Sequence, residues 1–311
     1  MGVSTSLDTD GFLADRGPGE EEEALARYTD GFWSRDGLRL HFRDYAGGAD
    51  GRPAVLCLPG LTRNARDFAG LAERLSPAWR VIAGSFRGRG KSEYARDASA
   101  YVPATYVGDV QALIAELALD AYLAIGTSLG GLVTMLMAEA ERPRIRGVVL
   151  NDVGPELEAA GIARIRTYVG RGGSWPTWLH AARALADIHA QAYPDYAIED
   201  WLRMAKRLYR LSGQGRIVID YDARIAEPMR RAADQPPPDL WPTLDALRDV
   251  PALILRGELS DVLGAATAAR MAAVLPQAEV VTVPRTGHAP TLEEPDAAAA
   301  IDRLLARVMS R

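Results

Sequence analysis

Short apolar runs alternate with amphipathic segments along most of this 311-residue chain. Six of the runs are too short for independent helices and too continuously apolar for strands with one face in water, and they indicate buried strands of a mainly parallel sheet: residues 54–58, 80–83, 122–125, 147–150, 252–255 and 280–283. The stretches between them carry helical periodicity, at residues 67–75, 103–119, 129–141, 267–275 and 295–309. This order predicts an α/β protein with a doubly wound sheet.

One long segment, residues 154–242, interrupts the alternation. Its pattern is helical, with breaks at 170–174, 212–215 and 235–238 and no buried strand, so we expect a helical cap inserted into a core formed by residues 25–153 and 243–311. Nine of the chain's 17 Trp and Tyr residues lie in this cap, which predicts an aromatic inner face. Trp175, Trp178 and Trp201 are candidates for contact with a ligand, although packing within the cap is the commoner role for any single ring.

Two features precede the sheet. Residues 1–24 are polar and end in the acidic run 20–23, a composition that buries little, so we expect a disordered tail. Apolar residues alternate on both sides of the dipeptide Asp36-Gly37, which predicts a β-hairpin.

Charge and composition argue against several classes of function. The chain has 36 basic and 41 acidic residues, a formal charge of -5, and no basic stripe that would bind nucleic acid or an anionic membrane. No apolar run approaches the roughly 20 residues that span a bilayer. The single cysteine, Cys57, cannot form an internal disulfide, and no leader pattern is visible, so we expect a cytoplasmic protein. We expect a small-molecule substrate and no cofactor, because no metal-ligand cluster or phosphate-binding glycine loop is present.

The strongest local signal is Gly126-Thr127-Ser128-Leu129-Gly130, between the strand at 122–125 and the helix at 129–141. A serine held in a sharp strand-to-helix turn has strained backbone angles and an exposed hydroxyl, and small neighbours let the strand and helix approach. The helix that follows directs free N–H groups and the positive end of its dipole to the same place. The segment therefore predicts a nucleophile at Ser128.

A serine nucleophile needs a base with a pKa near about 7, in practice a histidine. Of the four histidines, only His288 lies in a loop directly after a predicted parallel strand. Loops after such strands meet at one edge of the sheet, where Ser128 also emerges. His288 is therefore the predicted base.

The base in turn needs a carboxylate that orients it. The loop after strand 252–255 supplies Asp261, our preferred choice, and Glu258, which is nearer the strand end and has less reach. Asp152 follows strand 147–150, which also neighbours the nucleophile, and it remains an alternative.

An oxyanion would need two backbone donors. The N–H of Leu129 follows the nucleophile directly, and the turn after strand 54–58 offers the N–H of Leu61. Arg63 and Arg66 lie in the same turn region; either could hold a substrate carboxylate, although a solvated position is the commoner one for a surface arginine.

With these residues in place, the chain resembles the α/β-hydrolase superfamily from Phe32 to Met309, and above all its capped bacterial branch of esterases, enol-lactonases and carbon–carbon bond hydrolases. The matching segments are Leu58-Pro59-Gly60, Phe86 to Ser92, Gly126 to Gly131, Arg256-Gly257-Glu258 with Asp261, and Gly287-His288. The resemblance implies triad roles for Ser128, Asp261 and His288 and a cap at residues 154–242. Members that open epoxides or remove halides carry Asp at the nucleophile position, so Ser128 argues against both activities.

Two positions depart from the family pattern. Pro59 stands where many relatives have His before the oxyanion glycine, and Ser85 stands where relatives commonly have Asp. Neither change touches the predicted triad.

These observations predict a serine hydrolase that cleaves a small carboxylic ester or lactone through an acyl-enzyme on Ser128. The alternative within the family is a carbon–carbon bond hydrolase of a ring-fission acid, which would need a cation such as Arg63 for the acidic end of its substrate. A binding protein that kept the fold and lost turnover is the third hypothesis, which the complete set of predicted catalytic residues disfavours.

Overall fold

The computed structural model describes residues 28–48, 51–232 and 237–310. The predicted disordered tail at residues 1–24 lies outside the described residues.

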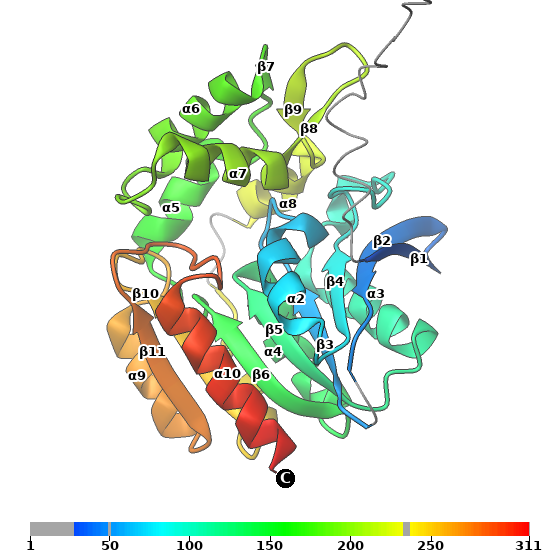
Figure 1. The fold of residues 1–311 in the computed structure, drawn as a ribbon, viewed down its shortest axis with the longest axis vertical. Helices are drawn as coiled ribbons and strands as arrows, with labels where there is room; N and C mark the ends of the chain where they lie inside the picture. Colours follow the sequence, from blue (N-terminus) through cyan, green and yellow to red (C-terminus); the bar gives the residue numbers. More distant parts are fainter. Residues whose placement is uncertain (1–27, 49–50, 233–236, 311) are drawn as a thin grey trace, which may run out of the picture.

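An eight-stranded sheet in the order β1-β2-β4-β3-β5-β6-β10-β11 forms the centre of the protein (Figure 1). Its strands are β1 (Thr29–Arg35), β2 (Leu38–Tyr45), β3 (Ala54–Leu58), β4 (Val81–Ser85), β5 (Tyr122–Thr127), β6 (Ile145–Asn151), β10 (Ala252–Gly257) and β11 (Ala278–Val283). The strands from β4 to β11 are parallel, whereas β1 and β2 form the predicted antiparallel hairpin, with Asp36 and Gly37 at positive φ in its turn. The predicted mainly parallel α/β fold is confirmed, and all six predicted strands are present. Five of them are buried; β11, at the edge of the sheet, is mostly half-buried or exposed, so its predicted burial was wrong.

Helices cover both faces of this sheet. One face packs against α2 (Ala69–Leu75) and α10 (Pro295–Met309), and the other against α3 (Pro103–Glu116), α4 (Leu129–Glu141) and α9 (Ala265–Val274). Successive strand residues alternate between the two cores: Leu56 belongs to one, and Cys57, fully buried, to the other. Short 3-10 helices η1 (Ala65–Phe68), η2 (Ala98–Ala100) and η4 (Trp241–Leu247) complete this part of the chain.

The segment predicted as a cap lies over the carboxyl ends of the parallel strands (Figure 1). It contains α5 (Ala159–Tyr168), α6 (Trp178–His189), α7 (Ile198–Leu208), η3 (Ala223–Ile225) and α8 (Ala226–Arg231). It also contains a small antiparallel sheet, in the order β7 (Ser174–Trp175), β9 (Ile217–Ile219), β8 (Tyr209–Leu211). The predicted cap thus contains three short strands besides its helices. The sequence did not indicate them, because strands of two or three residues are too short to show a period.

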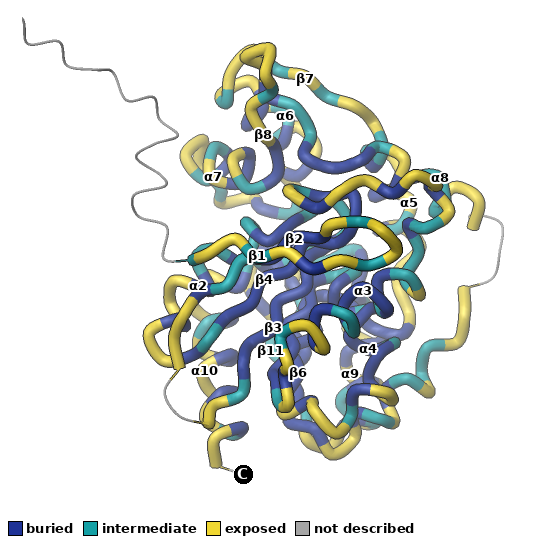
Figure 2. The backbone as a smooth tube through the Cα atoms, turned by 90° about the vertical axis from the view of Figure 1, so that its right-hand side faces the viewer, coloured by how far each residue is buried: buried dark blue, intermediate teal, exposed yellow. Residues whose placement is uncertain are grey.

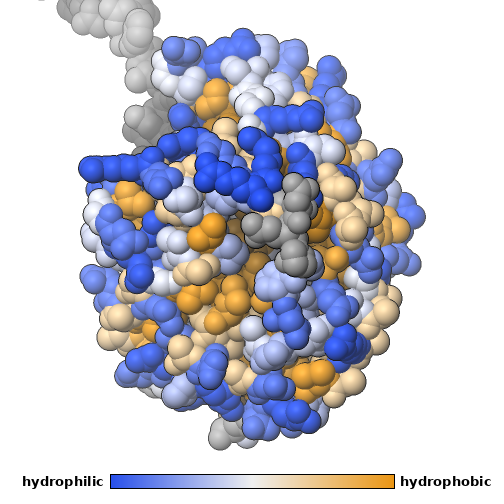
Figure 3. Space-filling view, turned by 180° about the vertical axis from the view of Figure 1, so that it is seen from behind, coloured by the Kyte–Doolittle hydropathy of each residue, from blue (hydrophilic) through white to orange (hydrophobic). Residues whose placement is uncertain are grey.

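The buried part of the chain follows the central sheet and the inward sides of its helices, while exposed segments lie at the periphery (Figure 2). On the back of the molecule, hydrophilic side chains cover the upper part, and hydrophobic ones gather near the middle (Figure 3). Within the described residues, no helix has the length and apolar character needed to cross a membrane.

The packing of α4 against β3 gives a direct test of this architecture. A Cβ on Gly130 would lie 1.9 Å from the carbonyl oxygen of Leu58, so we expect Gly130→Ala to lower the free energy of unfolding by about 1–3 kcal/mol, although Ala is normally favoured over Gly inside a helix. Gly213→Ala is the matched control, because a Cβ there meets no atom within 4 Å. Urea unfolding of both variants measures the difference; equal midpoints would contradict the close approach.

Candidate active site

Ser128 occupies the turn between β5 and α4 in a strained conformation, with φ 52° and ψ -114°. Its backbone N–H donates to the carbonyl oxygen of Asn151 at 3.0 Å, which ties the turn to the end of β6. A Cβ on Gly126 would lie 2.5 Å from the carbonyl oxygen of Gly130, so the small neighbours are required for strand and helix to meet. The expected strand, turn and helix are therefore all present around Ser128.

His288 joins Ser128 to a buried carboxylate. Its Nε2 lies 2.9 Å from Ser128 Oγ, and its Nδ1 lies 2.7 Å from Asp152 Oδ2. With the proton on Nδ1, the imidazole donates to Asp152 and leaves Nε2 free to accept the serine proton. These distances match those that a nucleophile, a base and an orienting acid require.

Asp152 is held firmly in this position. It directly follows β6, is fully buried and has φ 56°. Its Oδ1 accepts from the backbone N–H of Gly257 at 2.9 Å, and its Oδ2 accepts from Ser260 Oγ at 2.6 Å. The hydroxyl of Ser260 in turn accepts from the N–H groups of Val262 and Leu263, so it positions the carboxylate. These hydrogen bonds hold both oxygens of the Asp152 carboxylate in place, so its orientation toward His288 is fixed.

The preferred placement of Asp261 beside His288 was wrong. Both carboxylate oxygens of Asp261 bind Arg164 of α5, at 2.5 Å and 2.7 Å, and this guanidinium lowers the pKa of Asp261. The other alternative, Glu258, accepts from the backbone N–H of Arg285 at 2.7 Å. The physical reason is a difference in bonding: Asp152 directly follows β6 and is held beside His288 by Gly257 and Ser260, whereas the carboxylate of Asp261 binds Arg164 of the cap.

The two predicted oxyanion donors, Leu61 and Leu129, lie in the turn after β3 and at the start of α4. Leu61 lines the cavity together with Gly60 and Ser128, and Leu129 is the first residue of α4, where backbone N–H groups have no partner within the helix. The fully buried Arg89 donates from Nε to the carbonyl oxygen of Leu61 at 2.9 Å and so fixes this turn.

The departure at Ser85 has a structural counterpart. Its Oγ accepts from the backbone N–H of Ala65 at 3.1 Å and lies 3.2 Å from Nδ1 of His41. Ser92 Oγ donates to the carbonyl oxygen of Ser85 at 2.7 Å. A hydroxyl and a buried histidine therefore connect this loop to β2 without a carboxylate at position 85.

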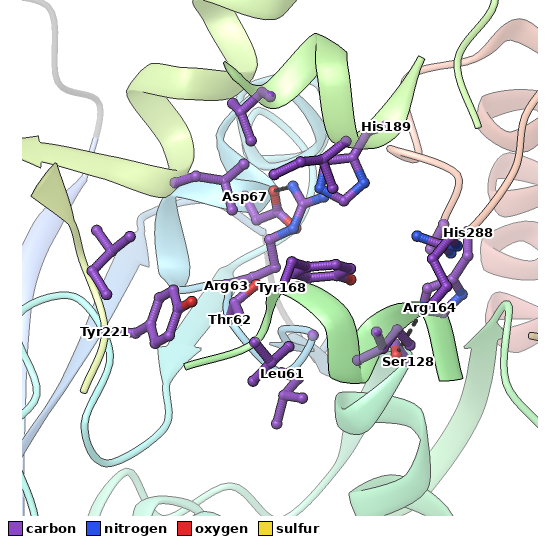
Figure 4. Close-up of a pocket in the computed structure, with 18 of the residues that line it drawn as sticks. Leu61, Thr62, Arg63, Asp67, Ser128, Arg164, Tyr168, His189, Tyr221 and His288 are labelled. Atoms are coloured by element: carbon purple, nitrogen blue, oxygen red, sulfur yellow. Dashed lines mark hydrogen bonds and ion pairs between the residues drawn. The ribbon is translucent and has the colours of Figure 1, made fainter. Parts of the chain in front are cut away.

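A cavity of about 480 Å³ opens above Ser128 and His288, between the cap and the core. Figure 4 shows Ser128 and His288 at one end, Tyr221 at the other, and Arg63 with Tyr168 between them. Its apolar wall comes mainly from the cap and includes Ile165, Val169, Leu185, Ile188, Leu208 and Ile219.

The candidates for substrate contact divide into two groups. Arg63 and Trp175 line the cavity. Trp201, only 4% exposed, packs edge-to-face against Tyr193 in the interior of the cap, and Trp178 packs against the same interior, so neither is a wall residue. Arg66 also points elsewhere and binds Asp220 at 2.7 Å. The sequence did not show where these side chains point. Amphipathic periodicity indicates which face of a helix is buried, but not whether that face packs against the cap interior or lines the cavity.

Several polar groups of the cavity wall were not predicted from the sequence, among them Arg164, His189 and the phenol of Tyr168. His189 is 9% exposed, and burial, together with the charges of Arg63 and Arg164, lowers its pKa to about 3. It is therefore neutral at pH 7. No pattern in the sequence distinguishes these residues from ordinary helix residues.

The loop that carries His288 contacts the cap as well as the core. The backbone N–H of Gly287 donates to the carbonyl oxygen of Ala192 at 2.6 Å, and Tyr193 donates its hydroxyl to the carbonyl oxygen of Ala289 at 2.8 Å. Hydrogen bonds on both sides of His288 thus connect it to the segment between α6 and α7.

A family model described as the alpha/beta hydrolase family matches residues 55–301. The chain belongs to the alpha/beta hydrolase family. It is 33% identical over 264 residues to a 3-hydroxybutyrate-oligomer hydrolase of Cupriavidus necator, covering 83% of this chain and 89% of that one. It is 29% identical over 253 residues to a 2-(acetamidomethylene)succinate hydrolase of Mesorhizobium japonicum, covering 81% and 85%. A solved alpha/beta hydrolase from Novosphingobium aromaticivorans is 55% identical, with a TM-score of 0.87 over 91% of this chain and 99% of that one.

Two carboxylate variants of this hydrolase separate the competing acids. We expect Asp152→Asn to lower kcat by about 10³- to 10⁴-fold, because an amide stabilises the wrong tautomer of His288. Asp261→Asn removes a partly exposed ion pair with Arg164, so its effect should stay within about fivefold. Steady-state hydrolysis of one ester by both variants measures this difference. A larger loss in Asp261→Asn would return Asp261 to the role of orienting acid.

Proposed function

We propose that the protein is a cytoplasmic serine hydrolase that cleaves a small carboxylic ester or lactone through an acyl-enzyme on Ser128. The observation that carries the proposal is the continuous chain of contacts from Ser128 Oγ through His288 to the buried Asp152. The named activity of the Cupriavidus relative supports an ester, because an oligomer of 3-hydroxybutyrate is linked by ester bonds.

The residues fit an acyl-transfer reaction in two halves. Ser128 Oγ attacks the carbonyl carbon as His288 Nε2 takes its proton, and the backbone N–H groups of Leu61 and Leu129 bind the oxyanion. Collapse breaks the ester bond, and His288 returns the proton to the departing alcohol. Water then attacks the acyl-enzyme by the same route, releasing the acid and restoring Ser128. The carboxylate of Asp152, bound to Nδ1 of His288, orients the imidazole and stabilises the imidazolium in both halves.

An activated serine gives the clearest test of this proposal. We expect a fluorophosphonate probe to label the wild type and not Ser128→Ala, and 4-nitrophenyl acetate to be hydrolysed only by the wild type. Labelling with little turnover of any ester would favour a binding protein that kept the fold. Absence of labelling in a folded wild type would refute the proposal.

A carbon–carbon bond hydrolase remains the second candidate, because Arg63 on the cavity wall supplies the cation that an acidic ring-fission substrate would need. The two activities are separable by direct comparison of 4-nitrophenyl esters with a vinylogous ring-fission diketone acid. We expect the esters to be cleaved with the higher kcat/KM; the reverse order would select the second candidate.

A further inference from the structure

Two arginines of the cavity wall, Arg63 and Arg164, differ in how many side-chain hydrogen bonds they make. The Nε and Nη2 edge of Arg164 is occupied, since both nitrogens bind the carboxylate of Asp261. Arg63 makes one side-chain hydrogen bond within the described residues, from Nη1 to Asp67 Oδ1 at 3.0 Å. The Nε and Nη2 edge of Arg63 is therefore unoccupied, and it is the edge that a carboxylate binds with two parallel hydrogen bonds.

The Arg63 guanidinium is sheltered but reachable. Its side chain is 19% exposed, and it lies in the middle of the cavity beside Asp67 and Tyr168 (Figure 4). Burial alone would lower the pKa of Arg63, but the charge of Asp67 raises it, so the group stays cationic. The neighbouring His189 is neutral and does not compete for an anion, and its buried Nδ1 has no hydrogen-bond partner in the described part of the chain.

Arg63 also lies close to the nucleophile. A Cβ built on Gly60 would be 3.4 Å from Cγ of Arg63 and 3.7 Å from Cβ of Ser128, so the two side chains start on either side of one glycine. An ester held at Ser128 and directed along the cavity would therefore pass the guanidinium. The aliphatic wall around it suits a short carbon chain between the ester and an anionic end.

We propose that Arg63 binds a free carboxylate on the substrate, so that the preferred substrates are short esters whose acyl or alcohol part ends in a carboxylate. This inference rests on the proposed ester hydrolysis. Asp67 binds at Nη1 and leaves the Nε and Nη2 edge free, but its negative charge competes with a substrate carboxylate for the positive charge of the same guanidinium.

Monomethyl and dimethyl esters of C4, C6 and C8 dicarboxylic acids test the proposal, because each pair differs only in one charge. We expect the wild type to prefer the monoester of at least one length, in kcat/KM, by about 10- to 100-fold, the contribution typical of a hydrogen bond to a charged group. Arg63→Gln should remove this preference. Arg231→Gln is the control: it removes another i,i+4 ion pair, that with Glu227 in α8, outside the cavity, and should retain the preference for the monoester.

Asp67→Asn separates a binding role of Arg63 from a merely structural one, because only a binding role predicts a change in the KM of the monoester alone. Without its competitor, Arg63 should bind the substrate carboxylate more tightly, so the KM of the monoester should fall several-fold while that of the diester stays constant. This variant also decides the question if Arg63→Gln does not fold.

Three results would overturn the inference: equal kcat/KM for mono- and diesters of every length, an unchanged monoester KM in Asp67→Asn, or loss of the preference in Arg164→Gln and not in Arg63→Gln. Hydrolysis of 4-nitrophenyl acetate that depends on Ser128 would leave the proposed function standing in each case.

Discussion

The close approach of α4 to the carboxyl ends of β3 and β5 is the constraint on which the rest of the site depends. Gly126 and Gly130 have no Cβ, so the backbones of strand and helix meet without a side chain between them. The chain can then turn sharply at Ser128, and the start of the helix faces the turn at Gly60 and Leu61. The positions of the predicted nucleophile and of the predicted oxyanion donors therefore depend on one packing contact.

The carboxylate beside His288 depends on a second constraint, which is the hydrogen bonding between the ends of β6 and β10. Asp152 directly follows β6, and its backbone N–H donates to the carbonyl oxygen of Leu255 in β10 at 2.8 Å. Asp152 receives hydrogen bonds there from Gly257 and Ser260, both in the segment that also contains Asp261. The loop after β10 therefore contributes donors to the acid, while its own carboxylate binds the cap through Arg164.

Local patterns predicted the sheet, the hairpin, Ser128 and His288, because each is determined by neighbours in the sequence. The β6 strand was predicted two residues short at its start, yet its position was right. The choice between Asp152 and Asp261 was not local: it depended on side-chain reach across two strands and on Arg164, which lies 97 residues from its partner. The same limit applied to Trp178 and Trp201, whose helical spacing is compatible with either a cavity wall or the interior of the cap.

The hydrogen bonds that flank His288 give the cap a role beyond covering the cavity. Gly287 and Ala289 are both bound to the segment between α6 and α7, by Ala192 and Tyr193. Movement of that segment would therefore be transmitted to the imidazole, and access to the cavity and alignment of the base are mechanically linked. A shortened chain lacking the cap would not be a more open version of the same hydrolase, because it would have lost the two cap hydrogen bonds that flank His288.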